Sequence, residues 1–328
     1  PDDDDDPDQE EVVFPETDAE ILADTFMRQA EWMAEEGFTP EGILYGLNYR
    51  VPDSLETSVA DAPSFEEVLA QTRVDMQKTA VYHLTAPGEH AVTLQTASGE
   101  IVGRVQVRPT VDPAAPLLLF HHGFNEYPYT NSWRRLFPTA VSLPVHTVCV
   151  QAPFHDNWQD PTQIGFASVQ NVYQIFAGSL RIMALVQRQF EAEGAAYTVA
   201  AGVSWGGITS LLYEGLLQQT RAVIPMLSSP NLAQVIWDIS DLFNRPMQLT
   251  QEELRQYLDF TAYYEQCAAD RVFPLLGEND LFFRLENHAE LFAERPLVTI
   301  PASHISAMWH SASMRDHILN ILAQVRPM

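Results

Sequence analysis

The spacing of hydrophobic residues predicts helices first and strands afterwards. Between residues 17 and 79, apolar side chains recur every three or four positions in two stretches, which begin at Thr17 and Ser64. This spacing places them on one face of an α-helix. Gly37 follows the first stretch, as is common where a helix ends. We therefore predict an N-terminal helical extension over residues 17–79, with its second helix over residues 64–77.

The hydrophobic period changes to two at residue 80. Apolar and polar residues alternate over residues 80–86, 91–97 and 101–109, which is the pattern of strands with one covered face. Ser98 and Gly99 supply turn residues between the second and third runs. These runs predict antiparallel strands at the start of a sheet.

Beyond Pro116 the apolar runs become short and continuous, and helix-like stretches separate them. This arrangement is typical of a parallel sheet that is covered by helices on both faces. We therefore predict one doubly wound, mostly parallel α/β domain over residues 80–328, with the antiparallel strands at its start. Its predicted parallel strands lie at 117–120, 145–150, 197–202, 222–227, 272–277 and 297–300.

One connection between the predicted strands is much longer than the others. Residues 230–270 contain two helix-like pieces, and Thr250 with Glu253 forms a capping box at the start of the second piece. Long insertions in compact domains tend to be functional. We predict a small helical lid here, and a plain helical crossover that covers the sheet is the alternative.

Charge narrows the classes of partner. Residues 1–16 are strongly acidic, which predicts a disordered tail, and the chain of 328 residues carries a formal net charge of -26. This charge repels nucleic acid and anionic membrane surfaces, so we expect neither as a partner.

Cys149 and Cys267 lie far apart in the sequence, which favours reduced thiols and a cytoplasmic location. Removal of a leader before Pro1 is the alternative.

The strongest candidate for chemistry is a serine between two glycines. The stretch GVSWG, residues 202–206, follows an apolar strand-like run and precedes a helix-like run. A serine in this context stands on a sharp turn at the end of a strand, and small residues are needed beside it because the turn is tight. Ser204 is therefore a candidate nucleophile.

At this motif the chain resembles the α/β-hydrolase superfamily, and the resemblance extends over residues 80–328. It implies that Ser204 is the nucleophile and that the backbone N–H of Trp205 forms half of an oxyanion hole. His122 and Gly123 follow an apolar strand-like run, similar to the family's oxyanion loop. By that resemblance the backbone N–H of Phe124 is the second donor.

The family's acid and base are expected after the last two strands. Asp280, three residues past Gly277, matches the usual position of the acid, and Glu278 is the alternative. His304 lies on the loop after the final strand, where the resemblance places the base. Ser303 stands where the family usually has a glycine. His310 and His317 are assigned to the final helix or its entry.

The adjacent residues His121 and His122 suggest a metal site at first sight. Neighbouring residues on a strand point to opposite faces, however, and no partner at ligand spacing follows them. We expect no metal and no organic cofactor, and we interpret the two histidines as structural or substrate-pocket residues.

Aromatic residues near the lid and the predicted loops are candidates for an apolar pocket: Trp237, Phe243, Tyr263, Tyr264, Phe282, Phe283 and Trp309.

The resemblance implies a carboxylesterase-like serine hydrolase that cleaves a small-molecule ester through an acyl-enzyme. A peptidase, thioesterase or acyltransferase on the same three residues is the alternative within this chemistry. A non-catalytic binding protein with a hydrolase fold is the alternative outside it. The N-terminal extension is a candidate contact surface for a homodimer, and an extension of the rim of the site is the alternative.

Overall fold

The computed structural model describes residues 53–138, 143–157, 159–242 and 247–326. The predicted acidic tail (1–16) and most of the predicted helical extension lie outside the described residues. Both remain predictions, and so does the division of the chain into domains. Inside the described part, no helix is both long and apolar enough to cross a lipid bilayer.

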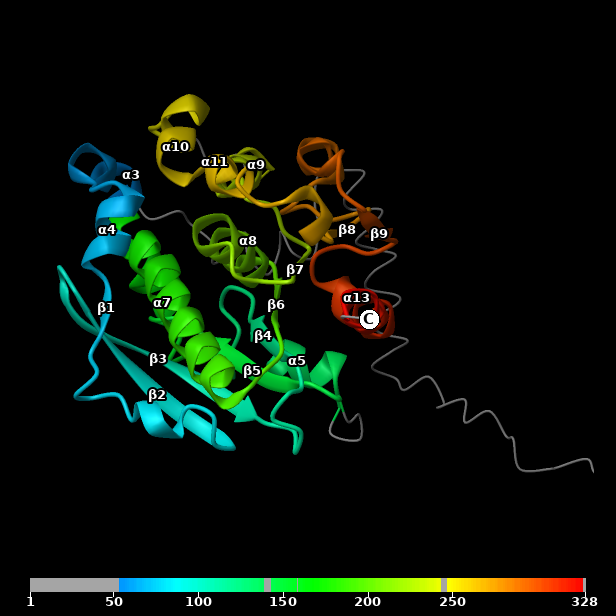
Figure 1. The fold of residues 1–328 in the computed structure, drawn as a ribbon. Coiled ribbons are helices and arrows are strands. Elements are labelled where there is room, and N and C mark those ends of the chain that lie inside the picture. Colours follow the sequence, from blue (N-terminus) through cyan, green and yellow to red (C-terminus); the bar gives the residue numbers. More distant parts are fainter. Residues whose placement is uncertain (1–52, 139–142, 158, 243–246, 327–328) are drawn as a thin grey trace, which may run out of the picture. The chain divides into compact units, whose positions relative to one another are not determined.

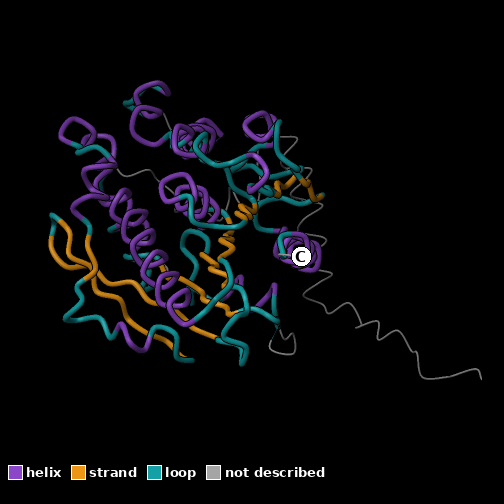
Figure 2. The backbone as a smooth tube through the Cα atoms, in the orientation of Figure 1, coloured by secondary structure: helices purple, strands orange, loops and turns teal. Residues whose placement is uncertain are grey.

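One sheet of nine strands organises the described residues, in the order β1-β2-β3-β5-β4-β6-β7-β8-β9 (Figures 1 and 2). Neighbouring strands from β1 to β5 pair antiparallel, and those from β5 through β4 to β9 pair parallel. This confirms the predicted mostly parallel sheet with antiparallel strands at its start. The strands span Arg73–Val74 (β1), Gly88–Thr96 (β2), Gly99–Arg108 (β3), Leu117–His121 (β4), His146–Gln151 (β5), Thr198–Val203 (β6), Ala222–Met226 (β7), Leu275–Gly277 (β8) and Val298–Ile300 (β9).

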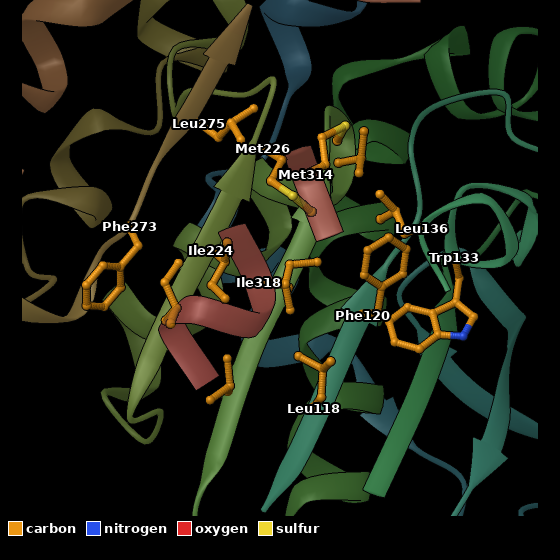
Figure 3. Packing of buried hydrophobic residues seen from close by; sticks show 14 of the residues in the cluster. Leu118, Phe120, Trp133, Leu136, Ile224, Met226, Phe273, Leu275, Met314 and Ile318 are labelled. Atoms are coloured by element: carbon orange, nitrogen blue, oxygen red, sulfur yellow. The ribbon is translucent and has the colours of Figure 1, made fainter. Parts of the chain in front are cut away.

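Helices cover both faces of this sheet, which is why β4 to β7 are buried along their whole length and have continuous apolar sequences. On one face, α13 packs against β7 and α5. Figure 3 shows Met314 and Ile318 of α13 among side chains of β4 and β7, such as Leu118 and Ile224. The long helix α7 contacts β1 to β5, the helix α8 contacts β4, β6 and β7, and the two helices contact each other. The helices span Asp53–Thr57 (α3), Phe65–Gln71 (α4), Asn131–Leu136 (α5), Asp160–Gln163 (α6), Val169–Glu193 (α7), Trp205–Leu217 (α8), Leu232–Leu242 (α9), Gln251–Leu258 (α10), Thr261–Tyr264 (α11), Leu285–His288 (α12) and Ser311–Gln324 (α13).

The prediction of a strand over residues 80–86 was wrong. Val81–His83 forms a 3₁₀ turn, in which Val81 and Leu84 are buried and Tyr82 is exposed. A spacing of three between buried residues suits this turn, whereas a strand would bury every second side chain. The alternation of residue types in this run therefore reflects a short turn that packs two side chains into the core.

The predicted helix over residues 64–77 is shorter than expected. It ends at Gln71, since the backbone of Thr72 is extended with ψ 119°, while the N–H and the hydroxyl of Thr72 both donate to the carbonyl oxygen of Val68 and close the last turn. The chain then becomes extended, and Arg73–Val74 pairs with β2 as the first strand of the sheet. Part of the predicted helical extension therefore belongs to the sheet.

The connection between β7 and β8 is helical, as predicted, and contains α9, α10 and α11 (Figure 1). Its Thr250–Glu253 capping box is present at the start of α10. Asn231 and Asp259 pair as an isolated antiparallel bridge, so the chain leaves and returns at one place. We call residues 232–258 the β7–β8 insertion. Phe243 lies outside the described residues.

Candidate active site

Ser204 stands on a sharp turn between β6 and α8. Its backbone has φ 55° and ψ -120°, and its N–H donates to the carbonyl oxygen of Met226 at 2.8 Å. A positive φ is uncommon for a residue with a side chain, and it persists only where the surrounding structure enforces it. The turn holds the half-buried serine hydroxyl at the carboxyl end of the parallel strands, where open α/β sheets bind ligands.

The glycines beside Ser204 are required by close backbone contacts. A methyl group on Gly202 would lie 2.2 Å from the carbonyl carbon and oxygen of Gly206. A methyl group on Gly206 would lie 2.1 Å from the carbonyl oxygen of His121. Neither position can accept a side chain without moving backbone, so the GVSWG sequence is a direct consequence of how tightly β4, β6 and α8 approach one another.

The loops after β8 and β9 bring Asp280 and His304 to the serine. His304 Nε2 lies 2.9 Å from Ser204 Oγ, and His304 Nδ1 lies 2.7 Å from Asp280 Oδ2. The other oxygen of Asp280 accepts the backbone N–H groups of Phe282 and Phe283 at 2.8 and 3.0 Å. The buried carboxylate is therefore fixed by its own loop and orients the imidazole toward the serine hydroxyl.

The alternative acid and bases lie elsewhere. The exposed Glu278 accepts a hydrogen bond from the hydroxyl of Thr299 at 2.9 Å. His317, in α13, bonds through Nε2 to the carbonyl oxygen of Phe273 at 3.0 Å, and His310 precedes the first residue of the same helix. The structure brings Asp280 and His304 to Ser204 and brings none of these three alternatives there.

One predicted oxyanion donor follows the serine in the chain, and the residue before the other donor lies beside the serine in space. Trp205 is the first residue of α8, and a methyl group on Gly123, next to Phe124, would lie 3.7 Å from Ser204 Cβ. Among the described residues, no acceptor bonds to the backbone N–H of Phe124 or Trp205. Both groups are therefore available to an anion, and the N-terminus of α8 adds a favourable potential.

Aromatic rings line the surroundings of these groups. The Trp205 ring stacks on Phe176 with centroids 4.1 Å apart, and the Phe124 ring lies 5.3 Å from Trp205. On the other side, the rings of Phe282 and Phe283 lie 4.8 and 5.6 Å from the His304 imidazole. The catalytic candidates therefore sit between apolar groups.

The other aromatic residues proposed for the pocket have mixed positions. Tyr264 packs in a core cluster with Leu211 and Phe292. Tyr263 lies against Phe65, with ring centroids 5.5 Å apart. Trp309 is 55% exposed. None of these contacts joins them to Ser204, so they remain unassigned as pocket residues.

The expectation that His121 and His122 point to opposite faces was wrong. Strand β4 ends at His121, and the two rings stack with centroids 4.9 Å apart. His155 lies across His122 at 4.7 Å. Burial lowers the pKa of all three imidazoles, that of His122 to about 4, so they are neutral near pH 7. No group of three metal-ligating side chains occurs within the described ranges.

Glu126, on the loop after β4, was not predicted from the sequence. Its Oε2 accepts the N–H of Gly123 at 3.1 Å, and its Oε1 accepts the N–H and the hydroxyl of Ser132 at 2.6 and 2.9 Å. Burial raises the pKa of this carboxyl group to about 7. The sequence carries no signal for this arrangement, because the fold brings Gly123 and Ser132 to the two carboxylate oxygens.

Comparison with known proteins gives a likeness in structure and none in sequence. The sequence matches no protein-family model and no curated protein. An esterase from Pyrococcus furiosus superposes with a TM-score of 0.50 at 10% identity, over 73% of this chain and 92% of its own.

Two further solved structures have TM-scores of 0.49. A cold-adapted esterase from an Arctic intertidal metagenomic library is 18% identical, over 70% of this chain and 92% of its own. An enol-lactonase from Burkholderia xenovorans is 12% identical, over 68% of this chain and 97% of its own. At such identities the likeness concerns the fold.

Proposed function

The chain has the α/β-hydrolase fold, and on this premise we propose that it is a serine hydrolase that cleaves a carboxylic ester. The observation that carries the proposal is the continuous chain of hydrogen bonds from Ser204 through His304 to Asp280, at 2.9 and 2.7 Å. A serine hydroxyl is a weak nucleophile at neutral pH and needs a positioned base. A chain of these three groups meets that need.

The first half of the reaction forms an acyl-enzyme. His304 Nε2 takes the proton of Ser204 as Oγ attacks the ester carbonyl carbon, and Asp280 stabilises the imidazolium that results. The N–H groups of Phe124 and Trp205 donate to the oxygen that becomes negative. His304 then gives its proton to the alcohol oxygen as the ester bond breaks.

The second half releases the acid by the same groups in reverse. A water molecule loses a proton to His304 and attacks the acyl carbon, and the two N–H groups again stabilise the anion. His304 returns the proton to Ser204 Oγ as the acyl bond breaks. All proton transfers pass through one imidazole, which the Asp280 carboxylate keeps in one orientation.

The surroundings favour an apolar acyl group. The partly exposed rings of Phe124 and Phe282 lie beside the reacting groups, with the buried rings of Trp205 and Phe283 behind them, and apolar side chains bind apolar groups by removing them from water. We assign the β7–β8 insertion the role of a lid over this site.

The test is covalent labelling of the protein with a fluorophosphonate, followed by peptide mapping and by assays with p-nitrophenyl esters of increasing chain length. We expect one adduct, on Ser204, and turnover of the esters. Labelling without ester turnover would favour a thioesterase, peptidase or acyltransferase. A folded protein that forms no adduct and hydrolyses no ester would overturn the proposal in favour of a binding protein.

A further inference from the structure

Hydrogen bonds hold Gly123 from two directions. His122 Nε2 accepts the N–H of Ala152 at 3.0 Å, so its Nδ1 carries the proton and donates to the carbonyl oxygen of Gly123 at 2.6 Å. The N–H of Gly123 in turn donates to Glu126 Oε2 at 3.1 Å. Neither peptide unit that flanks the Gly123 Cα can rotate without breaking one of these bonds.

This restraint determines the direction of the Phe124 N–H. The carbonyl of Gly123 and the N–H of Phe124 belong to one planar peptide unit, so fixing the carbonyl fixes the N–H on its other side. A methyl group on Gly123 would lie 3.7 Å from both Glu126 Oε2 and Ser204 Cβ. A single residue therefore separates the carboxyl group of Glu126 from the side chain of the proposed nucleophile.

The second oxygen of Glu126 connects the loop to the core. Oε1 accepts the N–H and the hydroxyl of Ser132, which lies in the first turn of α5. The next residue, Trp133, is buried and packs against Phe120 of β4 with ring centroids 5.1 Å apart. The carboxyl group thus ties the loop after β4 to a helix that the core holds in place.

We infer that Glu126 is a positioning residue for the oxyanion hole, whose carboxylate holds Gly123 so that the Phe124 N–H points at the oxygen that becomes negative. This inference rests on the proposed function. Oxyanion donors act mainly in the transition state and must be aligned before the reaction. The ionised carboxylate suits this task because it accepts three donors and offers none.

Protonation of Glu126 weakens the restraint. A neutral carboxyl group carries a proton on one oxygen, and that oxygen becomes a donor. Protonation of Oε2 disturbs one accepted hydrogen bond, whereas protonation of Oε1 disturbs two. The bond to Gly123 is therefore the one that is lost. Burial raises the pKa of Glu126 to about 7. The Cys149 thiol interacts electrostatically with Glu126, and burial raises the pKa of that thiol and keeps it neutral.

The kinetic test compares the wild type with Glu126→Gln and Glu126→Ala, and Glu278→Gln serves as the charge-matched control. We expect kcat of the Glu126→Ala variant to fall about 10- to 100-fold at pH 8, with KM changed less than about twofold, because the lost alignment matters in the transition state. The fall of log(kcat/KM) toward acid pH should be steeper in the wild type and the control than in Glu126→Gln, because the variant lacks the carboxyl group that titrates near pH 7. Equal slopes in the wild type and Glu126→Gln would overturn the protonation step.

A second readout does not depend on activity. Amide hydrogen exchange at pH 8 in a peptide that covers residues 120–127 should be faster in Glu126→Ala than in the wild type, while peptides from β6 and α13 are unchanged. Unchanged exchange at residues 120–127 would overturn the positioning role, whether or not esters are hydrolysed. If exchange rises but neither labelling nor turnover occurs in the wild type, the proposed function fails and the positioning role stands.

Discussion

The carbonyl oxygen of His121 lies so close to the Cα of Gly206 that a methyl group there would approach it to 2.1 Å. This contact joins the end of β4 to the first turn of α8, on either side of the proposed nucleophile. It is a contact between two backbones, so no side-chain rotation can relieve it.

Gly206→Ala is therefore expected to lower the free energy of unfolding by about 3 kcal/mol or more, because overpacking against backbone forces β4 and α8 apart. Urea unfolding monitored by circular dichroism measures the loss. Gly123→Ala is the matched control, because its methyl group meets its nearest atoms at 3.7 Å, and it should change stability by less than about 1 kcal/mol. Equal stability of the two variants would contradict the assigned role of Gly206.

Ser204→Ala should abolish ester turnover, with a fall in kcat of about 10⁴-fold or more, and should prevent fluorophosphonate labelling. A positive φ is as unfavourable for alanine as it is for serine. The melting temperature of the variant should therefore stay close to that of the wild type. Mass spectrometry and thermal unfolding check both expectations. Retention of full activity would remove Ser204 from its proposed role.

Asp280→Asn should lower kcat by roughly 10³- to 10⁴-fold, because an amide cannot accept with both of its terminal atoms and so fails to orient His304. Glu278→Gln should stay within about twofold of the wild type, because Glu278 bonds to Thr299 and lies apart from His304. Steady-state kinetics of the two variants decide between the acids. A larger loss in the glutamine variant would reverse the assignment.

The pH dependence of stability should differ between the wild type and Glu126→Gln. Burial raises the pKa of Glu126 from 4.5 to about 7, so the folded protein binds a proton that the unfolded chain releases between these values. The bound proton stabilises the folded state by on the order of 3 kcal/mol below pH 4.5, and this contribution is lost as the pH rises to 7. Urea unfolding of both proteins from pH 4.5 to 7.5 measures this difference. A difference that does not vary with pH would be inconsistent with the raised pKa.

Local sequence predicted most of the sheet, since the pattern of each strand depends on neighbours along the chain. The runs from Leu117 onward are apolar because both faces of β4 to β7 are covered. Ser204 was recognisable because a tight turn excludes side chains at Gly202 and Gly206. Asp280 and His304 followed from a resemblance, and geometry then separated Asp280 from Glu278.

Features that depend on distant partners could not be predicted in this way. Arg73–Val74 is a strand because β2 lies beside it, although its own sequence continues a helical pattern. Glu126 matters because the fold brings Gly123 and Ser132 to its two oxygens, and nothing in the spacing of these residues indicates that arrangement. His121 and His122 stack because the strand ends between them.

The bridge between Asn231 and Asp259 gives the β7–β8 insertion a narrow base. The segment enters and leaves the α/β frame at one point, while Ser204, Asp280 and His304 lie outside it. Evolution or engineering can therefore exchange this segment as a cassette, with a different length or composition, and leave the strand ends that hold the reacting groups in register. If the insertion is the proposed lid, its length and composition can change without moving the three groups of the proposed active site.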